Sequence, residues 1–249
     1  MNTKLICHLS IAASLIGTAS AATLAVNFSG RATSAGATPD ELLTQSGASA
    51  GTAAGANGTA TFQDIIANYN TSPGVGPLVI NGTDGSSANI NFVSNGTWSN
   101  TASSSRGVVA ENATGDLLDG HIEGSSPTGV SVTIDSLNFT GTYDLYVYIG
   151  DDAGGRSGSV TVDGVTRTFT SRIYDGTLVN ASAGGGAVGD YMLFSGLSGS
   201  TQTITMGGID SSNRTGLNGF EIIGTAVPEP GSTALLGLGG LALILCRRK

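Results

Sequence analysis

The segment Thr142-Tyr-Asp-Leu-Tyr-Val-Tyr-Ile149 gives the clearest structural signal in the chain. In an extended backbone, successive side chains point to opposite faces, so the segment divides into two sets. One face carries Tyr143, Leu145, Val147 and Ile149, and the other carries Asp144, Tyr146 and Tyr148. This pattern is typical of a strand that packs one face on a core and presents the other to solvent. It predicts a half-buried antiparallel strand on which Tyr146 and Tyr148 face outward.

Alternating segments continue on both sides of this strand. Residues 130–137 alternate apolar and polar side chains, and the pair Asp163-Gly164 separates two further alternating segments. A two-residue Asp-Gly link predicts a hairpin, because both positions of its tight turn need a positive φ. Other strand candidates are residues 23–28, 77–80, 88–93, 190–194, 201–206 and 217–223. Strands at this spacing predict an all-β body, an antiparallel β-sandwich or jelly roll, best defined over residues 129–224.

The first half of this body has a weaker pattern. Residues 44–61 are mostly Ala, Gly, Ser and Thr, and they are interpreted as a long loop or a weakly paired segment. A short turn of helix is predicted just before them, at residues 39–43. Residues 62–69 fit a strand or a helix equally well.

Composition excludes several classes of site in the body, residues 22–225. The two cysteines, Cys7 and Cys246, lie near the ends of the chain, which excludes a disulfide framework, a Cys-ligated zinc site and a Cys nucleophile. Between positions 22 and 229, six arginines and no lysine stand against eighteen acidic residues. Such an acidic body is repelled by phosphate backbones and anionic lipid surfaces, so nucleic acid is excluded as a partner.

The N-terminus has the three parts of a secretory signal peptide. A short region ending at Lys4 carries the positive charge, residues 5–16 are apolar, and Ala19-Ser-Ala21 provides a small-residue cleavage site. We therefore expect residues 1–21 to be a signal peptide, with cleavage after Ala21 or Ala22.

The C-terminus has the composition of a short membrane anchor. Val227-Pro-Glu-Pro-Gly231 breaks the chain, residues 234–246 are apolar, and the sequence ends on Arg247, Arg248 and Lys249. The apolar stretch is marginal for a helix that spans a bilayer, which takes about 20 residues. Three terminal cations would remain on the cytoplasmic side and leave the body outside. We expect a short, transient membrane-anchor helix.

This tail closely resembles the PEP-CTERM sorting signal of exported bacterial proteins, in which an exosortase acts at the Pro-Glu-Pro triplet. The resemblance covers residues 226–249 and implies that the exosortase and the secretion machinery are partners of the chain. The sorting residues that it implies are Pro228, Glu229, Pro230, Arg247, Arg248 and Lys249. It also implies export, an intermediate anchored in the inner membrane, and a final place at the cell surface or outside the cell.

A second resemblance concerns the strand pattern of residues 129–224. The order of Gly141-Thr-Tyr-Asp-Leu-Tyr-Val-Tyr, the hairpin around Asp163-Gly164, Tyr191-Met-Leu-Phe-Ser-Gly-Leu and Leu217-Asn-Gly-Phe-Glu-Ile-Ile is similar to galactose-binding-like jelly rolls. Carbohydrate-binding modules have this architecture, which implies a polysaccharide ligand. Sugar rings stack on exposed aromatic side chains. The candidate ligand-binding residues are therefore Trp98, Tyr146 and Tyr148, and a core position is the alternative for Trp98.

Two further patterns point to metal binding or catalysis. Asp151 and Asp152 lie in a Gly-rich loop after the central strand and could hold Ca²⁺, with a solvated turn as the alternative. Gly47-Ala-Ser49-Ala-Gly51 matches the serine hydrolase motif, but it lacks the strand-to-helix context which that chemistry requires. His121, the body's one histidine, is interpreted as a surface or turn residue.

Together these observations predict an exported, non-enzymatic β-sandwich protein of the cell surface or extracellular matrix of a Gram-negative-type bacterium. Its expected role is structural or adhesive, with weak polysaccharide binding and no obligatory cofactor. Two alternatives remain open. One is an extracellular carbohydrate-active enzyme, such as a glycoside hydrolase, or its accessory module, and the other is a calcium-stabilised adhesin.

Overall fold

A computed structural model describes most of the body between Ala21 and Ala226, and this range forms one compact unit. The described residues are 21–31, 41–42, 52–56, 58–68, 75–82, 86–93, 96–99, 117–118, 120–125, 129–150, 154–209 and 214–226. Residues 1–20 of the predicted signal peptide and the predicted anchor helix lie outside these residues, whereas Ala21 is the first residue of strand β1. Within them, no helix is both long enough and apolar enough to cross a bilayer.

The first sheet has eight strands among the described residues and runs in the order β15-β11-β17-β1-β5-β2; β9 also pairs with β17, and β8 pairs with β9. At its centre, β17 lies between β1 and β11 and pairs antiparallel with both. Its strands are β1 (Ala21–Arg31), β2 (Glu41–Leu42), β5 (Gln63–Asn68), β8 (Gly96–Ser99), β9 (Gly120–Ser125), β11 (Phe139–Gly150), β15 (Tyr191–Leu197) and β17 (Arg214–Ala226).

The second sheet has seven strands within the described ranges, in the order β14-β13-β12-β16-β10-β7-β6. Its strands are β6 (Val75–Asn81), β7 (Ser87–Val93), β10 (Val130–Asp135), β12 (Ser157–Val162), β13 (Val165–Ser171), β14 (Ala187–Gly189) and β16 (Thr201–Gly208). Burial alternates along β10, β12 and β16, so one face of this sheet is apolar and buried while the other meets solvent.

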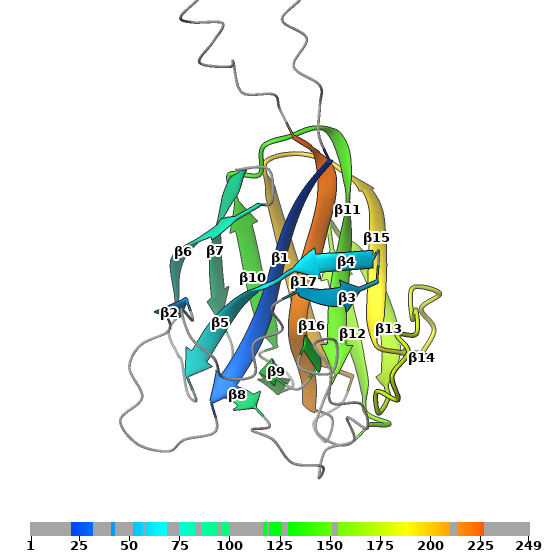
Figure 1. Cartoon of the computed structure of the whole chain (residues 1–249). Coiled ribbons are helices and arrows are strands. Elements are labelled where there is room, and N and C mark those ends of the chain that lie inside the picture. The colour runs from blue at the N-terminus through cyan, green and yellow to red at the C-terminus, as the bar shows by residue number, and fades with distance from the viewer. Residues whose placement is uncertain are drawn as a thin grey trace, which may run out of the picture. The chain divides into compact units, whose positions relative to one another are not determined.

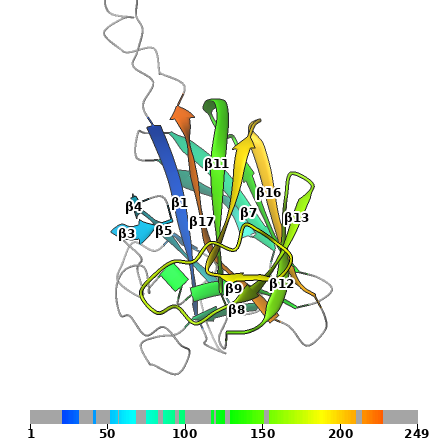
Figure 2. The same cartoon turned by 90° about the vertical axis from the view of Figure 1, so that its right-hand side faces the viewer.

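The two sheets pack face to face as a β-sandwich (Figures 1 and 2). One hydrophobic cluster joins their inner faces. It includes Val147 and Phe220 from the first sheet and Val132 and Ile204 from the second, all fully buried. Removing this apolar area from water is the main favourable contribution to folding.

The first sheet is also covered on its outer face. The small hairpin of β3 (Thr52–Gly55) and β4 (Gly58–Thr61) crosses over it, as Figure 1 shows. A second hydrophobic cluster lies on this side and contains Phe62, Leu117, Tyr146, Tyr148 and Tyr174. The central strands are therefore buried on both faces, and β11 is buried continuously from Leu145 to Gly150.

The all-β prediction is confirmed, since the described elements are strands and only Leu117 and Leu118 are helical. The predicted antiparallel pairing holds for most of the described strand pairs, but β1 pairs parallel with β5, and β13 pairs parallel with β14, so both sheets are mixed. The predicted helical turn at residues 39–43 is also wrong where it is described: Glu41 and Leu42 form β2. There, pairing with β5 overrides the weak local preference.

The Asp163-Gly164 hairpin is confirmed in detail. Val162 pairs with Val165, and the two turn residues have φ angles of 48° and 74°. Asp is one of the few non-glycine residues that enter this left-handed region readily, and glycine does so without steric cost. The turn fixes the register in which β12 and β13 pair.

We predict that Gly164→Ala lowers the free energy of unfolding by about 1–2 kcal/mol, the cost of placing a side chain in the left-handed region. The added methyl group would contact nothing, so the effect isolates backbone strain. Gly207→Ala, in strand β16 with equally open space, is the matched control and should change stability by less than about 0.5 kcal/mol. Urea unfolding would measure both variants, and an equal effect of the two would contradict this account.

Candidate functional site

The most distinctive polar group on the covered face is a buried pair, Tyr148 and Glu221. Strands β11 and β17 place the two side chains side by side, with Tyr146 directly opposite Glu221 in the register. The Tyr148 hydroxyl donates a hydrogen bond of 2.9 Å to Oε2 of Glu221 and accepts one of 2.8 Å from the backbone N–H of Ala56. Tyr148 is fully buried and Glu221 is 2% exposed.

The hairpin above this pair is shaped to approach it closely. Phe62 packs the edge of its ring on Tyr148, at 5.8 Å between ring centroids and an interplanar angle of 72°. A Cβ atom on Gly55 would lie 2.8 Å from both the Tyr148 hydroxyl and Oε2 of Glu221, so only glycine fits there. The Gly55 backbone and the Phe62 ring therefore both lie close against the pair.

Burial changes the acid–base properties of both residues. It raises the pKa of the Glu221 carboxyl, and the hydrogen bond from Tyr148 opposes this rise. Burial also raises the pKa of the Tyr148 hydroxyl, and the nearby Glu221 charge adds to that effect. Chemically, the pair is a carboxyl group that gains protons more readily than usual and a phenol that stays neutral.

Further along the same face, Asn218 fastens the segment that precedes β9 to the sheet. Its Nδ2 donates to the backbone oxygens of Leu118 and Gly120, at 2.9 and 2.8 Å. A Cβ atom on Gly150 would lie 2.7 Å from Oδ1 of Asn218, so this glycine is also required by close packing. These contacts keep the outer covering in place at the end of β11.

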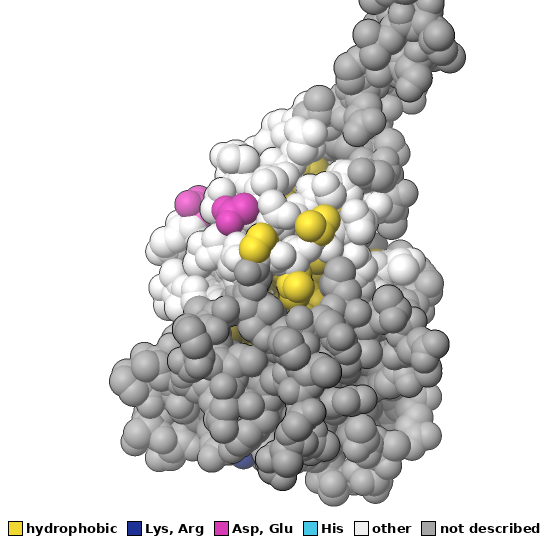
Figure 3. Space-filling model, turned by 90° about the vertical axis from the view of Figure 1, so that its left-hand side faces the viewer, with side chains coloured by type: hydrophobic (Ala, Val, Ile, Leu, Met, Phe, Trp, Pro, Cys, Tyr) yellow, Lys and Arg dark blue, Asp and Glu magenta, His cyan; other side chains and the backbone are white. Residues whose placement is uncertain are grey.

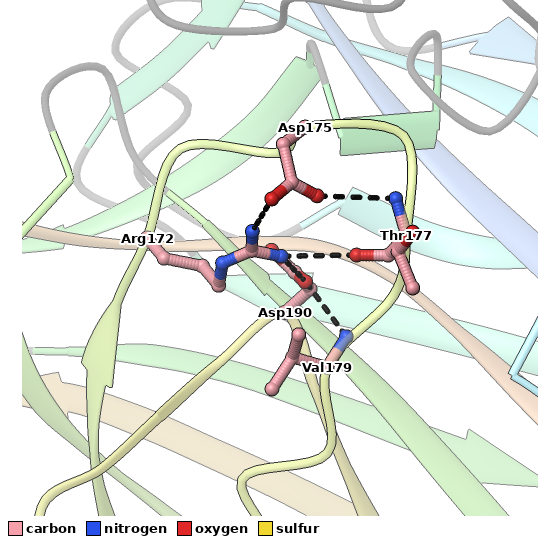
Figure 4. Close-up of polar contacts among 5 residues, drawn as sticks. All are labelled: Arg172, Asp175, Thr177, Val179 and Asp190. Atoms are coloured by element: carbon pink, nitrogen blue, oxygen red, sulfur yellow. Dashed lines mark hydrogen bonds and ion pairs between the residues drawn. The ribbon is translucent and has the colours of Figure 1, made fainter.

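A second polar cluster surrounds Arg172 in the loop between β13 and β14 (Figure 4). Its guanidinium forms ion pairs with Asp175 and with Asp190, the latter at 2.8 Å, and donates to the backbone oxygen of Thr177. Asp190 also accepts the N–H of Val179 at 2.8 Å. Burial raises the pKa of Asp190, while its bonds to Val179 and Arg172 oppose this. The cluster folds this loop so that Tyr174 covers the first sheet.

The predicted aromatic site is not brought together as expected. Tyr146 and Tyr148 lie on the face of β11 opposite the core, but they are 8% and 0% exposed, so the prediction that they face solvent is wrong. The physical reason is the second apolar layer, which takes up the face that solvent was expected to occupy. Trp98 lies in β8, paired with His121 of β9, and its side chain is outside the described residues.

The remaining candidates are placed as follows. His121 is 4% exposed in strand β9, so its prediction as a surface or turn residue is wrong. Ser49, Asp151, Asp152 and the six sorting residues between Pro228 and Lys249 lie outside the described residues. Among the residues that are described, no cluster of three or more His, Cys, Asp or Glu side chains could hold a metal ion.

Glu221 is a buried polar residue that reasoning from the sequence missed. The signal was a single acid inside the apolar run Phe220-Glu-Ile-Ile223, in the last strand of the body. An acid in such a run is either on a solvent face or buried with a partner, and the structure shows the second case.

Residues 226–249 match the PEP-CTERM protein-sorting motif. The motif indicates exosortase-dependent sorting, through a membrane-anchored intermediate, to the cell surface or beyond.

No curated protein matches the sequence. Among solved structures, a ruminal GH26 endo-β-1,4-mannanase is similar over 40% of this chain and 18% of its own, with 13% identity and a TM-score of 0.22. The Agl-KA catalytic domain is similar over 44% of this chain and 22% of its own, with 22% identity and a TM-score of 0.25. The chain thus spans about a fifth of the length of either structure.

Burial of Glu221 generates a prediction about pH. The unfolded carboxyl has its ordinary pKa near 4.5 and the folded one a higher pKa, so the folded state binds the proton more tightly. The free energy of unfolding should therefore fall as pH rises from 4.5 through the folded pKa. Glu221→Gln keeps an acceptor for Tyr148 but cannot titrate, so its melting temperature should fall less between pH 4 and pH 8 than that of the wild type.

Tyr148→Phe is a companion variant that should change the pH dependence of the melting temperature in the opposite direction. It removes the hydrogen bond that holds the Glu221 pKa down, so the pH dependence of the melting temperature should become steeper. Melting curves of the three proteins from pH 4 to 8 give the measurement. Parallel pH profiles for all three would show that Glu221 does not titrate differently in the folded state.

Proposed function

We propose that this chain is an exported, non-enzymatic protein of the bacterial cell surface or extracellular matrix, where its β-sandwich body adheres to polysaccharide. The observation that carries the proposal is the PEP-CTERM motif at residues 226–249, which begins at the last residue of strand β17. A sorting motif attached directly to a folded body indicates that display of the body is the purpose of sorting.

The proposed maturation has two steps. Residues 1–21 are removed as a signal peptide, and the tail then holds the chain in the inner membrane as a short, transient helix. The exosortase acts at Pro228-Glu-Pro230, with Arg247, Arg248 and Lys249 on the cytoplasmic side. The acidic composition of the body favours partners other than nucleic acid or anionic lipid.

The body is proposed to be a galactose-binding-like module with a structural or adhesive role. Two facing sheets around one core, with the first and last strands paired at the centre, support this architecture. A non-enzymatic role is supported by the contacts of Glu221, whose carboxyl group is bonded to Tyr148 and closed off by Gly55. A carbohydrate-active enzyme, or an adhesin that holds Ca²⁺ at Asp151 and Asp152, is the alternative.

The sorting step is tested by the double substitution Pro228→Ala and Pro230→Ala. Because the triplet is where the exosortase is proposed to act, the variant should remain at full length in the membrane fraction, while the wild-type chain reaches the surface or medium. Pro77→Ala, an exposed position in edge strand β6, is the control and should be sorted normally. Normal processing of the double variant would contradict the proposed role of the triplet.

Adhesion is tested with the full-length chain on insoluble cellulose and on the exopolymer of the cells that export it, with Ca²⁺ and with a chelator. Saturable retention in both conditions is the expected result for a calcium-independent adhesive module. Retention lost with the chelator, together with a lower melting temperature, would favour the calcium-stabilised adhesin, since a ligand that binds the native state stabilises it. Release of soluble sugar would favour the enzyme.

A further inference from the structure

The outer face of the second sheet carries a regular array of hydroxyl side chains. Alternation along five neighbouring strands turns their apolar residues into the core and their polar residues to solvent. We give the name hydroxyl face to fourteen polar residues of this outward side: Asn89, Asn91, Ser131, Thr133, Asp135, Ser157, Ser159, Thr161, Thr166, Thr168, Thr170, Thr201, Thr203 and Thr205. Eleven of these fourteen residues are Ser or Thr, and each is exposed or half-buried.

The strand register places these side chains in rows. Thr166, Thr161, Thr205 and Ser131 lie opposite one another across four strands, and Thr203, Thr133 and Asn91 form a second row. Neighbouring strands are about 4.8 Å apart, and alternate residues along a strand are about 6.7 Å apart. The face therefore repeats the same chemical group at nearly constant intervals in two directions.

Hydrogen bonds between neighbours hold the array in position. The hydroxyls of Thr161 and Thr166 are 2.8 Å apart, and Thr201 donates to Asp135 at 2.9 Å. The Thr133 and Thr203 hydroxyls are 3.5 Å apart. Thr is also restricted in χ1 by its branched Cβ. A ligand that binds here would lose little affinity to the ordering of side chains.

The near absence of charged residues on the hydroxyl face indicates which class of ligand could bind there. The hydroxyl face has a single carboxylate, Asp135, and no Lys or Arg, whereas about a quarter or more of an ordinary protein surface is charged. An anionic polymer would find no cation to pair with, and a cationic one would find only Asp135. Figure 3 shows that the described surface on the adjoining side is also mostly uncharged, with hydrophobic side chains in small groups.

We infer that the hydroxyl face is the surface through which the body binds neutral polysaccharide. Each Thr or Ser hydroxyl has one donor and two acceptor positions, so it can still bond a ligand while it bonds a neighbour. Sugar hydroxyls have the same capacity, and Thr methyl groups can contact the C–H faces of the rings. Since each hydrogen bond replaces one to water, the net gain per contact is small. Binding therefore requires many contacts, which long polymers provide and monosaccharides do not.

This inference rests on the proposed adhesive function and gives it a location. It replaces the aromatic site expected at Tyr146 and Tyr148, whose rings are covered. The occupant is a repeating neutral chain rather than a single sugar, because the array offers equivalent positions along each row.

Retention of the full-length chain on insoluble cellulose provides the test. Thr133→Val with Thr203→Val removes two central hydroxyls and keeps strand-forming side chains of the same shape. Thr133→Glu with Thr203→Glu adds two charges to the same place. Ser195→Glu with Ser198→Glu, at exposed positions on and after β15 of the other sheet, is the control for added charge. Melting curves confirm that each variant is folded.

The expected result is that both Thr133/Thr203 variants lose at least tenfold in affinity for cellulose, while the Ser195/Ser198 variant binds as the wild type does. Soluble glucose at high concentration should not displace the wild-type chain. If the wild type binds and the Thr133/Thr203 variants bind equally well, the hydroxyl face is not the site, although the adhesive function stands. If the wild type binds neither cellulose nor the exopolymer, both proposals are overturned.

Discussion

Burial of the first sheet on both of its faces is the constraint on which the rest of the body depends. Strands β11 and β17 pack one side on the sandwich core and the other under the β3–β4 hairpin and its neighbours. A central strand in this position has no solvent face on which to place polar groups. Glu221 is therefore held by Tyr148, which in turn is bonded to the hairpin through Ala56. Loss of the covering would expose apolar side chains and remove the hydrogen bond that the Tyr148 hydroxyl accepts from Ala56.

The second sheet differs because it is covered on one side only. Its inner residues join the common core, whereas its outer residues are mostly Ser, Thr and Asn, and several of these hydroxyls bond to one another across the strands. Cross-strand pairs of this kind contribute to sheet stability as well as to the surface they form. The sandwich thus combines a sheet that is specialised for internal packing with a sheet that is available to partners.

Much of this architecture could be predicted from residues 129–224, where alternation and the Asp163-Gly164 turn specify strands and register directly. The burial of Tyr146 and Tyr148 could not be predicted in this way. Alternation of residue types along a strand shows which side chains share a face, but not whether that face meets solvent or a second apolar layer. That layer comes in part from residues 52–61, whose Ala, Gly and Thr give no periodic signal of their own. Gly55 is small because the Tyr148–Glu221 pair lies beneath it, a reason that appears only once distant segments meet.

The pairing of the first strand with the last has a mechanical consequence. Ala21 lies opposite Thr225, so the chain enters and leaves the body at the same end of two neighbouring antiparallel strands. Tension between these two points would open the β1–β17 ladder one bond at a time, like a zipper. Tension between the tail and a matrix bound on the second sheet would instead load β17 in shear against both β1 and β11, with many bonds sharing the force. Single-molecule pulling should therefore give a higher rupture force in the shear geometry than in the geometry that pulls on Ala21 and Thr225. The shear geometry is the one in which a body bound to a matrix through its second sheet would be loaded.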